Sequence, residues 1–493
     1  MGTNLDALTH RDAPGWAGLN VLVTGLGVSG FAAADALLER GANVTVVDGK
    51  EPAAGSPLAD RAEILGVLGA HLLLGPQHPQ ALPEGGAPDL IVTSPGWAPH
   101  QPLLAAAAER AIPIWGDVEL AWRLRPEQGA APWITVTGTN GKTTTVQMLA
   151  SILSAAGLRA TSAGNVGTPV IEAIQDPQGY QVIAVELSSF QLHWSHSLRP
   201  LASACLNIAP DHVDWHGSLE EYTRAKGKVY ENTEIACVYN VADPVTERLV
   251  EQADVQEGCR AIGFTLGMPA PSMVGLVEEV LADRAFIDDR QRSAAELGTL
   301  DDLRDASGHV APHVIANALA AAALARAAGV PTSAIRDGLR AWTPEPHRIA
   351  HVATKDEVTW IDDSKATNPH AATASLTAYP SVVWIAGGLL KGAKVDELVA
   401  AARDRLRGVI LIGADREQIA EAMRRHAPDV PVIDVANTDT DAMDRVVQEA
   451  ALLARPGDVV LLAPAAASMD MFENYHQRGV AFAAAVERHL QEG

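Results

Sequence analysis

The stretch that decides the fold reads Trp133-Ile134-Thr135-Val136-Thr137-Gly138-Thr139-Asn140-Gly141-Lys142-Thr143-Thr144-Thr145. It begins as a short apolar, β-branched run, which is typical of a buried strand. Two glycines break the run, and residues 146–153 then have the apolar spacing of a helix. A strand, a glycine-rich turn, a lysine and a helix predict a phosphate-binding loop, because successive backbone N–H groups and the helix N-terminus point at an anion.

We expect this loop to bind ATP. Lys142 would neutralise the β- and γ-phosphates, and the hydroxyl of Thr143 would join the shell of a Mg²⁺ ion. The spacing departs from G-x-x-x-x-G-K-[ST], because Val136 occupies the position of the first glycine. The alternative is a glycine turn that carries an exposed lysine by chance; the shorter G-T-N-G-K-T pattern favours ATP.

Length and composition narrow the class of protein. A chain of 493 residues is too long for one core and predicts two to four domains. The net charge of −23 argues against a binder of nucleic acid or of membrane surfaces, since either needs a basic face. Cys205, Cys237 and Cys259 have no ligand-like spacing and indicate reduced thiols. The N-terminus lacks an apolar signal core and no run has transmembrane length, so we expect a cytoplasmic protein without membrane insertion.

The first region contains a second glycine motif. A strand at 19–24 leads into Gly25-Leu26-Gly27-Val28-Ser29-Gly30, a helix at 31–40 and a strand at 43–47 that ends at Asp48. This βαβ pattern is typical of a dinucleotide site, but the same turn holds any pyrophosphate, including that of UDP. A further strand at 89–93 ends in Ser94-Pro95-Gly96, at the edge of a parallel sheet where ligands bind.

The rest of the chain alternates between strands and helices, which predicts doubly wound sheets. Polar or proline-rich segments at 123–132 and 343–346 read as linkers, and the acidic, weakly periodic segment 266–308 reads as a surface insertion. We therefore expect three α/β domains at 1–131, 132–342 and 343–493. The expected elements of the second and third domains are strands 182–185, 202–206, 235–239, 382–386, 408–412 and 458–462 and helices 311–328, 369–378, 395–405, 416–425 and 441–453.

Three further residues of the second region are candidates for metal binding or catalysis. Glu186 ends a strand one βα unit after the loop, where a carboxylate is well placed for Mg²⁺, although a helix dipole also favours an acid there. His212 lies between two aspartates at the end of the next strand, as a metal ligand or a structural histidine would. Lys226 stands in a basic helical run that otherwise reads as a solvated face.

Taken in order, these motifs resemble the Mur ligase family, the ATP-dependent amide ligases that build the peptide stem of peptidoglycan. The third region supports the resemblance with His347-Arg348, the run Asp362-Asp363-Ser364-Lys365-Ala366-Thr367-Asn368, the loop 387–392 and the segment 462–472. These are similar to the branch that adds D-glutamate. One departure is Leu390, which stands before Lys391 where a smaller or polar residue is expected.

The resemblance implies a fold and a set of roles. The first domain would be Rossmann-like, the second a P-loop ATPase-like doubly wound sheet and the third again Rossmann-like. Residues matched to ATP are Gly138, Thr139, Asn140, Gly141, Lys142, Thr143, Thr144, Asn317 (adenine), Arg348 and Asp363. Residues matched to two Mg²⁺ ions are Thr143, Glu186, His212 and Lys226, the last as a carbamate. Residues matched to UDP-N-acetylmuramoyl-L-alanine are Val28, Ser29, Asp48, Ser94, Pro95, Gly96 and Asn165. Residues matched to D-glutamate are Lys365, Thr367, Lys391, Ser468 and Tyr475.

The implied reaction phosphorylates a carboxylate with ATP and lets the amine of D-glutamate attack the acyl phosphate. Lys142, Glu186, His212 and Lys226 would be the catalytic residues, in a monomer that closes about the linker at 343–346. Without the resemblance, Lys391 reads as a solvated loop lysine and Ser468 as a helix cap. Other readings are a Mur-type ligase for another amino acid or for folate, an NAD-dependent oxidoreductase that uses Gly25–Gly30 and Asp48, and a silent binding protein.

Overall fold

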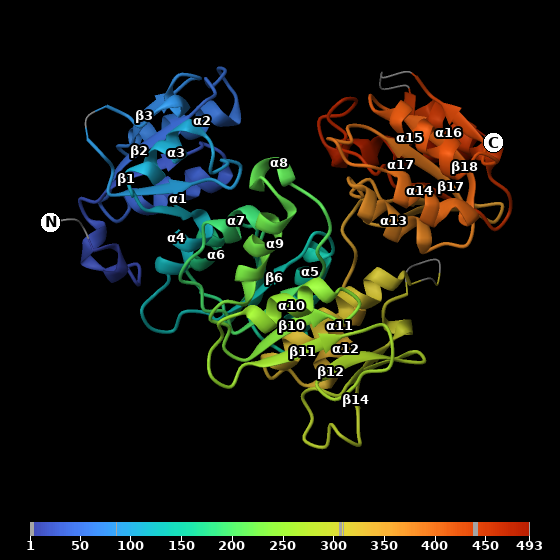
Figure 1. Ribbon diagram of the computed structural model, residues 1–493, viewed down its shortest axis with the longest axis horizontal. Coiled ribbons are helices and arrows are strands. Elements are labelled where there is room, and N and C mark those ends of the chain that lie inside the picture. Colours follow the sequence, from blue (N-terminus) through green and yellow to red (C-terminus); the bar gives the residue numbers. More distant parts are fainter. Residues whose placement is uncertain (1–3, 85, 305–307, 309, 437–441, 493) are drawn as a thin grey trace. The chain divides into compact units, whose positions relative to one another are not determined.

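The computed structural model describes residues 4–84, 86–304, 308, 310–436 and 442–492. These residues form three sheets, each flanked by helices (Figure 1). By compactness the chain divides into two units. The larger unit holds Met1–Asp302 and Ala316–Trp342, and the smaller holds Leu303–Ile315 and Thr343–Gly493.

The first sheet is parallel and has the strand order β3-β2-β1-β4-β5. Its strands are β1 (Asn20–Thr24), β2 (Asn43–Asp48), β3 (His71–Leu74), β4 (Leu90–Thr93) and β5 (Ile114–Gly116). Its helices are α1 (Val28–Leu38), α2 (Pro57–Val67), α3 (Pro102–Glu109) and α4 (Asp117–Arg123). Strand residues alternate between two cores: one face packs against α1, α2 and α4, and the other against α3.

The glycine motif of this sheet explains why α1 begins earlier than predicted. A Cβ at Gly30 would lie 1.8 Å from the carbonyl oxygen of Gly25, so only glycine lets the helix start this close to the turn. The helix therefore begins at Val28, whereas apolar spacing alone predicted residue 31. The predicted strands at 19–24, 43–47 and 89–93 are confirmed with ends shifted by at most one residue.

The second sheet has nine strands in the order β14-β13-β12-β11-β10-β9-β6-β8-β7. Its strands are β6 (Trp133–Thr137), β7 (Ala160–Gly164), β8 (Val182–Glu186), β9 (Ala202–Cys205), β10 (Ala236–Asn240), β11 (Arg260–Phe264), β12 (Met273–Val277), β13 (Val280–Asp283) and β14 (Ala295–Thr299). Its helices are α5 (Lys142–Ala155), α6 (Val170–Ile174), α7 (Ser189–His193), α8 (Val213–His216), α9 (Leu219–Gly227), α10 (Pro244–Gln252), α11 (Pro312–Ala327) and α12 (Thr332–Ala341). The strands β6 to β12 pair in parallel, as the predicted doubly wound sheet requires.

The segment predicted as a surface insertion, 266–308, contains three strands at the edge of the second sheet. There β12, β13 and β14 continue the sheet beyond β11, with β13 antiparallel to both neighbours. Leu281 and Leu297 are fully buried, and the buried carboxylate of Asp283 accepts a 2.9 Å hydrogen bond from Arg326 Nε on α11. The acidic composition indicated an exposed segment rather than strands. The folded chain can nevertheless bury an acidic side chain when a basic partner pairs with it, as Arg326 does with Asp283.

The third sheet has the order β15-β16-β20-β17-β18-β19, with β15 antiparallel and the others parallel. Its strands are β15 (Ala350–Lys355), β16 (Val358–Asp362), β17 (Val382–Gly387), β18 (Leu406–Ile412), β19 (Val432–Asp434) and β20 (Val459–Leu462). Its helices are α13 (Pro369–Thr377), α14 (Asp396–Ala402), α15 (Arg416–His426), α16 (Ala442–Leu453) and α17 (Tyr475–Glu492). Within the described ranges, no helix combines the length and the apolar character needed to span a bilayer.

Candidate active site

The phosphate loop joins β6 to α5 and has the backbone that anion binding requires. Gly138 (φ +152°) and Gly141 (φ +84°) adopt conformations that side chains disfavour. A Cβ at Gly141 would also lie 2.4 Å from Oδ1 of the buried Asn317 on α11. Lys142 Nζ donates to the carbonyl oxygens of Gly138 at 2.9 Å and Thr139 at 3.0 Å, so its charge lies over the loop.

Two residues that were absent from the predicted site hold this loop in place. Asn207, just after β9, accepts from Asn140 N at 2.8 Å and donates to Asn140 O at 3.1 Å. The hydroxyls of Thr139 and Tyr222 lie 2.8 Å apart. A sequence signal existed for both: Asn207 follows a strand end, and Tyr222 lies four residues before Lys226 on one face of a helix.

A hydroxyl and a carboxylate meet beneath the loop. Thr143 Oγ1 donates to Glu186 Oε2 at 2.7 Å, and both residues are buried. Asn165 Nδ2 donates to the other carboxylate oxygen at 2.9 Å. Oxygen donors of this kind beside a phosphate site are what Mg²⁺ prefers, with phosphates and water completing the shell. The chain's own residues thus fit a nucleotide-bound Mg²⁺, and Asn165 orients the carboxylate.

Lys226 places a buried amino group at the same strand edge. Its Nζ donates to Gly138 O at 2.8 Å and approaches Thr137 Oγ1 at 3.3 Å. Burial and the nearby Lys142 lower the pKa of Lys226 to about 7. At a pKa near 7 a large fraction of this amine is neutral at neutral pH, and a solvated helix face is the wrong description of this buried lysine.

His212 takes a strained backbone next to this cluster. Its φ of +49° is uncommon for a residue with a side chain. Its ring packs edge-on to Phe190 with centroids 4.7 Å apart, and Nε2 lies 3.6 Å from Asp211 Oδ2. Burial lowers the pKa of His212, which favours the neutral ring that can act as a ligand. Within the described ranges, no three His, Cys, Asp or Glu side chains converge on a point that could hold a metal ion.

In the first domain, Asp48 and Ser94 lie beside the glycine turn at residues 25–30. Asp48 Oδ2 accepts from Leu26 N at 2.7 Å, which fixes the glycine turn. Ser94 follows β4, and its buried hydroxyl has no hydrogen-bond partner among the described residues. Such an unpaired polar atom fits a ligand contact. Ser29 instead faces the buried carboxyl of Asp117, which also accepts from Gln191 Nε2 at 3.2 Å.

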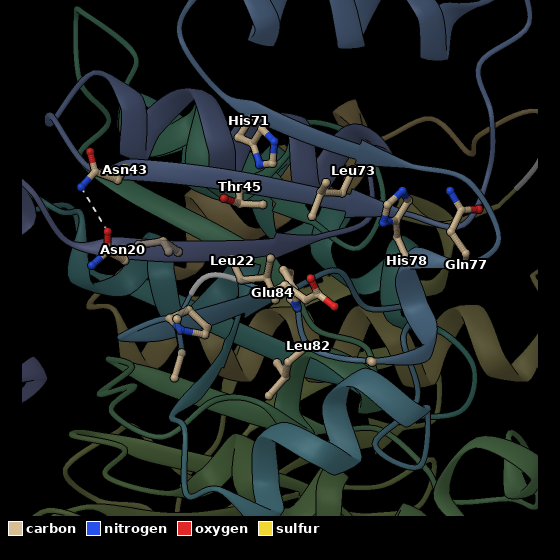
Figure 2. A pocket seen from close by; sticks show the side chains of 16 residues that line it. Asn20, Leu22, Asn43, Thr45, His71, Leu73, Gln77, His78, Leu82 and Glu84 are labelled. Carbon is tan, nitrogen blue, oxygen red and sulfur yellow. Dashed lines mark hydrogen bonds between the residues drawn. The ribbon is translucent and has the colours of Figure 1, made fainter.

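A separate cavity of about 680 Å³ opens on the same sheet. Figure 2 shows that Thr45, His71 and Leu73 lie along one face of β2 and β3, while Leu82 and Glu84 come from the segment before β4. The predicted residues Val28, Ser29, Asp48, Ser94, Pro95 and Gly96 are not among its lining residues. This cavity is therefore not the predicted nucleotide pocket.

In the smaller unit, the predicted nucleotide residues lie near β16. Asp363 follows the strand, and its buried carboxylate accepts from Ile349 N at 3.3 Å and from the hydroxyl of Ser375. Burial raises the pKa of Asp363 to about 6. Arg348 Nε pairs with Glu345 Oε2 at 3.2 Å in the same turn.

The predicted amino-acid residues of the smaller unit fall into two groups. Lys365 Nζ lies 3.9 Å from the ring centroid of Tyr475, and Thr367 N donates to Lys365 O at 2.8 Å. Lys391 is exposed in a left-handed turn (φ +51°), and Ser468 is buried in the loop between β20 and α17.

The loop that carries Lys391 explains the unexpected leucine before it. Leu389 pairs with Ala467 through two backbone hydrogen bonds of 2.8 and 2.9 Å. Leu390 is buried against the core of the third sheet, and its N–H donates to Asp415 Oδ2 at 2.8 Å. The apolar residue thus anchors the loop and leaves Lys391 exposed.

A phosphate-binding loop with a hydroxyl–carboxylate pair, on one of three α/β sheets, defines a nucleotide-dependent enzyme. Three family models match the chain: "Mur ligase MurD-like, N-terminal domain" at residues 19–116, "Mur ligase middle domain" at 136–325 and "Mur ligase, glutamate ligase domain" at 347–466. The chain is 62% identical to a UDP-N-acetylmuramoylalanine–D-glutamate ligase of Streptomyces avermitilis, over 96% of this chain and 98% of that protein. It is 46% identical to the protein of the same name in Mycolicibacterium smegmatis, over 96% and 97% of the two chains.

Solved structures agree on the fold. A UDP-N-acetylmuramate-alanine ligase of Thermotoga maritima superposes with a TM-score of 0.54 at 17% identity, covering 96% of this chain and 100% of that one. MurF of Acinetobacter baumannii gives 0.54 at 16% identity, covering 95% and 94%. The chain belongs to the Mur ligase family of ATP-dependent ligases, and the predicted fold class of three α/β domains is confirmed.

Proposed function

We propose that this protein adds D-glutamate to UDP-N-acetylmuramoyl-L-alanine in the cytoplasm, as a step of peptidoglycan precursor synthesis. The observation that carries the proposal is identity of 62% over nearly the full length to a relative with that name, together with a glutamate ligase domain model at residues 347–466. The phosphate loop, the Thr143–Glu186 pair and the lysines of the smaller unit would bind the ATP, the metal and the amino acid that such a reaction needs.

The larger unit would activate the carboxylate. ATP supplies the phosphoryl group that turns the substrate carboxylate into an acyl phosphate. Lys142 and the loop N–H groups offset the charge of the phosphates, and Thr143 and Glu186 would hold the first Mg²⁺. Asn317 would contact the adenine, and Arg348 and Asp363 the phosphate and ribose of the nucleotide, as their matched positions imply.

A second Mg²⁺ would be held by His212 and by a carbamate on Lys226. The neutral amine of Lys226 can add carbon dioxide and release one proton, which leaves an anionic carbamate where the protonated lysine would carry a positive charge. That anion supports a metal which an ammonium would repel. The strained φ of His212 supports a functional role, because the surrounding structure must stabilise it.

The remaining substrate contacts are assigned in the same way, with the nucleotide substrate on the larger unit and the amino acid on the smaller unit. Val28, Ser29, Asp48, Ser94, Pro95, Gly96 and Asn165 would bind UDP-N-acetylmuramoyl-L-alanine, and Lys365, Thr367, Lys391, Ser468 and Tyr475 would bind D-glutamate. Lys391 would pair with the side-chain carboxylate that distinguishes glutamate. We further propose domains at 1–131, 132–342 and 343–493, closure about 343–346, and a monomer.

Phosphate release from ATP tests the function directly. Purified protein is given UDP-N-acetylmuramoyl-L-alanine, with D-glutamate, L-glutamate or another amino acid supplied in turn. Release that needs both the nucleotide substrate and D-glutamate is the expected result. Release with a different amino acid would reassign the pocket of the smaller unit, and quenching or enhancement of NADH fluorescence would instead favour the oxidoreductase reading.

A further inference from the structure

The smaller unit contains a chain of three hydrogen-bonded side chains that the proposed substrate contacts do not use. Asp362 Oδ2 lies 2.5 Å from His347 Nδ1, and His347 Nε2 lies 2.9 Å from His476 Nδ1. Asp362 and His347 are buried, with exposed fractions of 2% and 6%, whereas His476 is exposed on the first turn of α17. This series of hydrogen-bonded side chains therefore leads from a buried carboxylate to the surface.

The carboxylate fixes the protons along this chain. An ionised carboxylate only accepts hydrogen bonds, so His347 carries its proton on Nδ1. Its Nε2 is then an acceptor, and His476 must donate from Nδ1. It follows that Nε2 of neutral His476 bears a lone pair, and no described residue donates a hydrogen bond to it.

The surrounding structure fixes the positions of these three side chains. His347 has a left-handed backbone (φ +65°), and a Cβ at Gly479 would lie 2.1 Å from its Nδ1, so glycine is required there. Ser364 Oγ donates to Tyr475 O at 2.8 Å and accepts from Arg478 Nε at 3.0 Å, which fixes the start of α17.

The chain adjoins the predicted amino-acid pocket. Lys365 N donates to His347 O at 3.1 Å, and Lys365 Nζ lies over the ring of Tyr475, the residue before His476. The charged groups next to these side chains are Asp363 beside Asp362, Arg478 on α17, which interacts with Asp362 and Asp470, and Lys365, whose backbone N–H donates to His347 O. The protonated side chains of Lys365 and Arg478 have no lone pair to accept a proton from a substrate ammonium, whereas Nε2 of neutral His476 has one.

We propose that His476 is the base that removes a proton from the ammonium group of the incoming amino acid, with His347 and Asp362 as the positioning residues behind it. This rests on the proposed function, because it requires an amino acid bound beside Lys365 and Tyr475. The ammonium has no lone pair and cannot attack an acyl phosphate. Transfer of one proton to Nε2 of His476 leaves a neutral amine and an imidazolium, whose Nδ1–H still donates toward His347 and the Asp362 carboxylate. The imidazolium then loses its proton to solvent.

The test compares His476→Gln with the wild-type protein and with His489→Gln, the same change near the other end of α17. In the wild type, kcat for D-glutamate should reach a plateau near neutral pH. In His476→Gln, kcat at pH 7 should fall by about 10²-fold and keep rising with pH toward the pKa of the amino acid, with KM for D-glutamate unchanged. His489→Gln should behave as the wild type.

Hydroxylamine separates this step from the rest of the reaction, because it is largely uncharged at neutral pH and needs no base. Formation of the acyl hydroxamate from ATP and the nucleotide substrate should be equal in His476→Gln and the wild type. The proposal would be overturned if kcat of His476→Gln reached the same plateau near neutral pH as the wild type, or if this variant had a raised KM for D-glutamate with unchanged kcat. If His476→Gln also loses hydroxamate formation, the Asp362→Asn variant is measured instead. Loss of its kcat plateau near neutral pH supports the roles of Asp362, His347 and His476, and a retained plateau refutes them. A wild-type protein that forms the hydroxamate but never uses D-glutamate would refute the proposed function instead.

Discussion

Replacement of Glu119 by alanine will destabilise the larger unit, because this carboxylate joins its first two sheets. Glu119 lies on α4 and is fully buried. It accepts hydrogen bonds from Arg123 Nε at 2.7 Å, His196 N at 2.8 Å, Ser197 N at 2.9 Å and Ser197 Oγ at 2.6 Å. The last three donors belong to the loop after α7, so the carboxylate fixes α4 against the nucleotide-binding sheet.

The expected loss follows from the groups that alanine would leave behind. The Arg123 side chain is only 11% exposed, and the two backbone N–H groups would lose their acceptor. Removal of one partner from a buried ion pair costs about 3–5 kcal/mol, mostly through the uncompensated charge. We expect a decrease of that size in the free energy of unfolding of the larger unit.

Urea unfolding, followed by tryptophan fluorescence, measures this change; Trp115, one of the ten tryptophans, has its ring centroid 4.4 Å from the Arg123 guanidinium. The pH dependence gives a second check. Burial raises the pKa of Glu119, but bonds from Ser197, Arg123 and the backbone N–H groups outweigh it, and the net pKa lies below 4.5. Its contribution is therefore complete above about pH 4.5 and declines as the pH falls through the lower native pKa.

Glu39→Ala is the matched control. Its carboxylate is 60% exposed and lies 3.4 Å from Arg40, so its loss should cost at most about 1 kcal/mol. A Glu119→Ala protein that unfolds within 1 kcal/mol of the control at pH 7, or one whose deficit grows below pH 4, would refute the reasoning.

Three further changes probe the nucleotide site and its surroundings. Lys226→Ala should nearly abolish ligation, and short carboxylic acids should restore part of it in a phosphate-release assay; full activity without them would exclude the carbamate. Gly141→Ala should weaken ATP binding at least tenfold by calorimetry, because the left-handed φ and the contact with Asn317 both oppose a Cβ; unchanged affinity would contradict the loop geometry. Because burial raises the pKa of Asp363 to about 6, ionisation of this carboxyl destabilises the folded state as the pH rises from 3.8 to about 6. Asp363→Asn should therefore raise the melting temperature more at pH 8 than at pH 4.5. An equal shift at both pH values would argue against a buried carboxylate with a raised pKa.

Some elements of the fold escaped prediction because their sequence signals are weak. The short strands β3 and β5 contain four and three residues, too few for a clear period. The strands β12 to β14 lie in an acidic segment whose charges are paired only in the folded chain. The helices α2, α3 and α4 flank strands that the sequence analysis did not assign.

The sequence by itself determined the local motifs. The strand, turn and helix around Lys142 depend on neighbouring residues, because positive φ at glycine and apolar spacing are local properties. Family resemblance, itself carried by such motifs, predicted the class of enzyme and the sites to look for.

Only the tertiary structure decided which side chains meet. Asn207 and Asn140 are 67 positions apart, Tyr222 and Thr139 are 83, and His476 and His347 are 129. Sheet order and helix packing bring such pairs within hydrogen-bonding distance, and no local pattern records them. The same packing sets the burial of Lys226 and Glu119, and burial gives these charges their energetic weight.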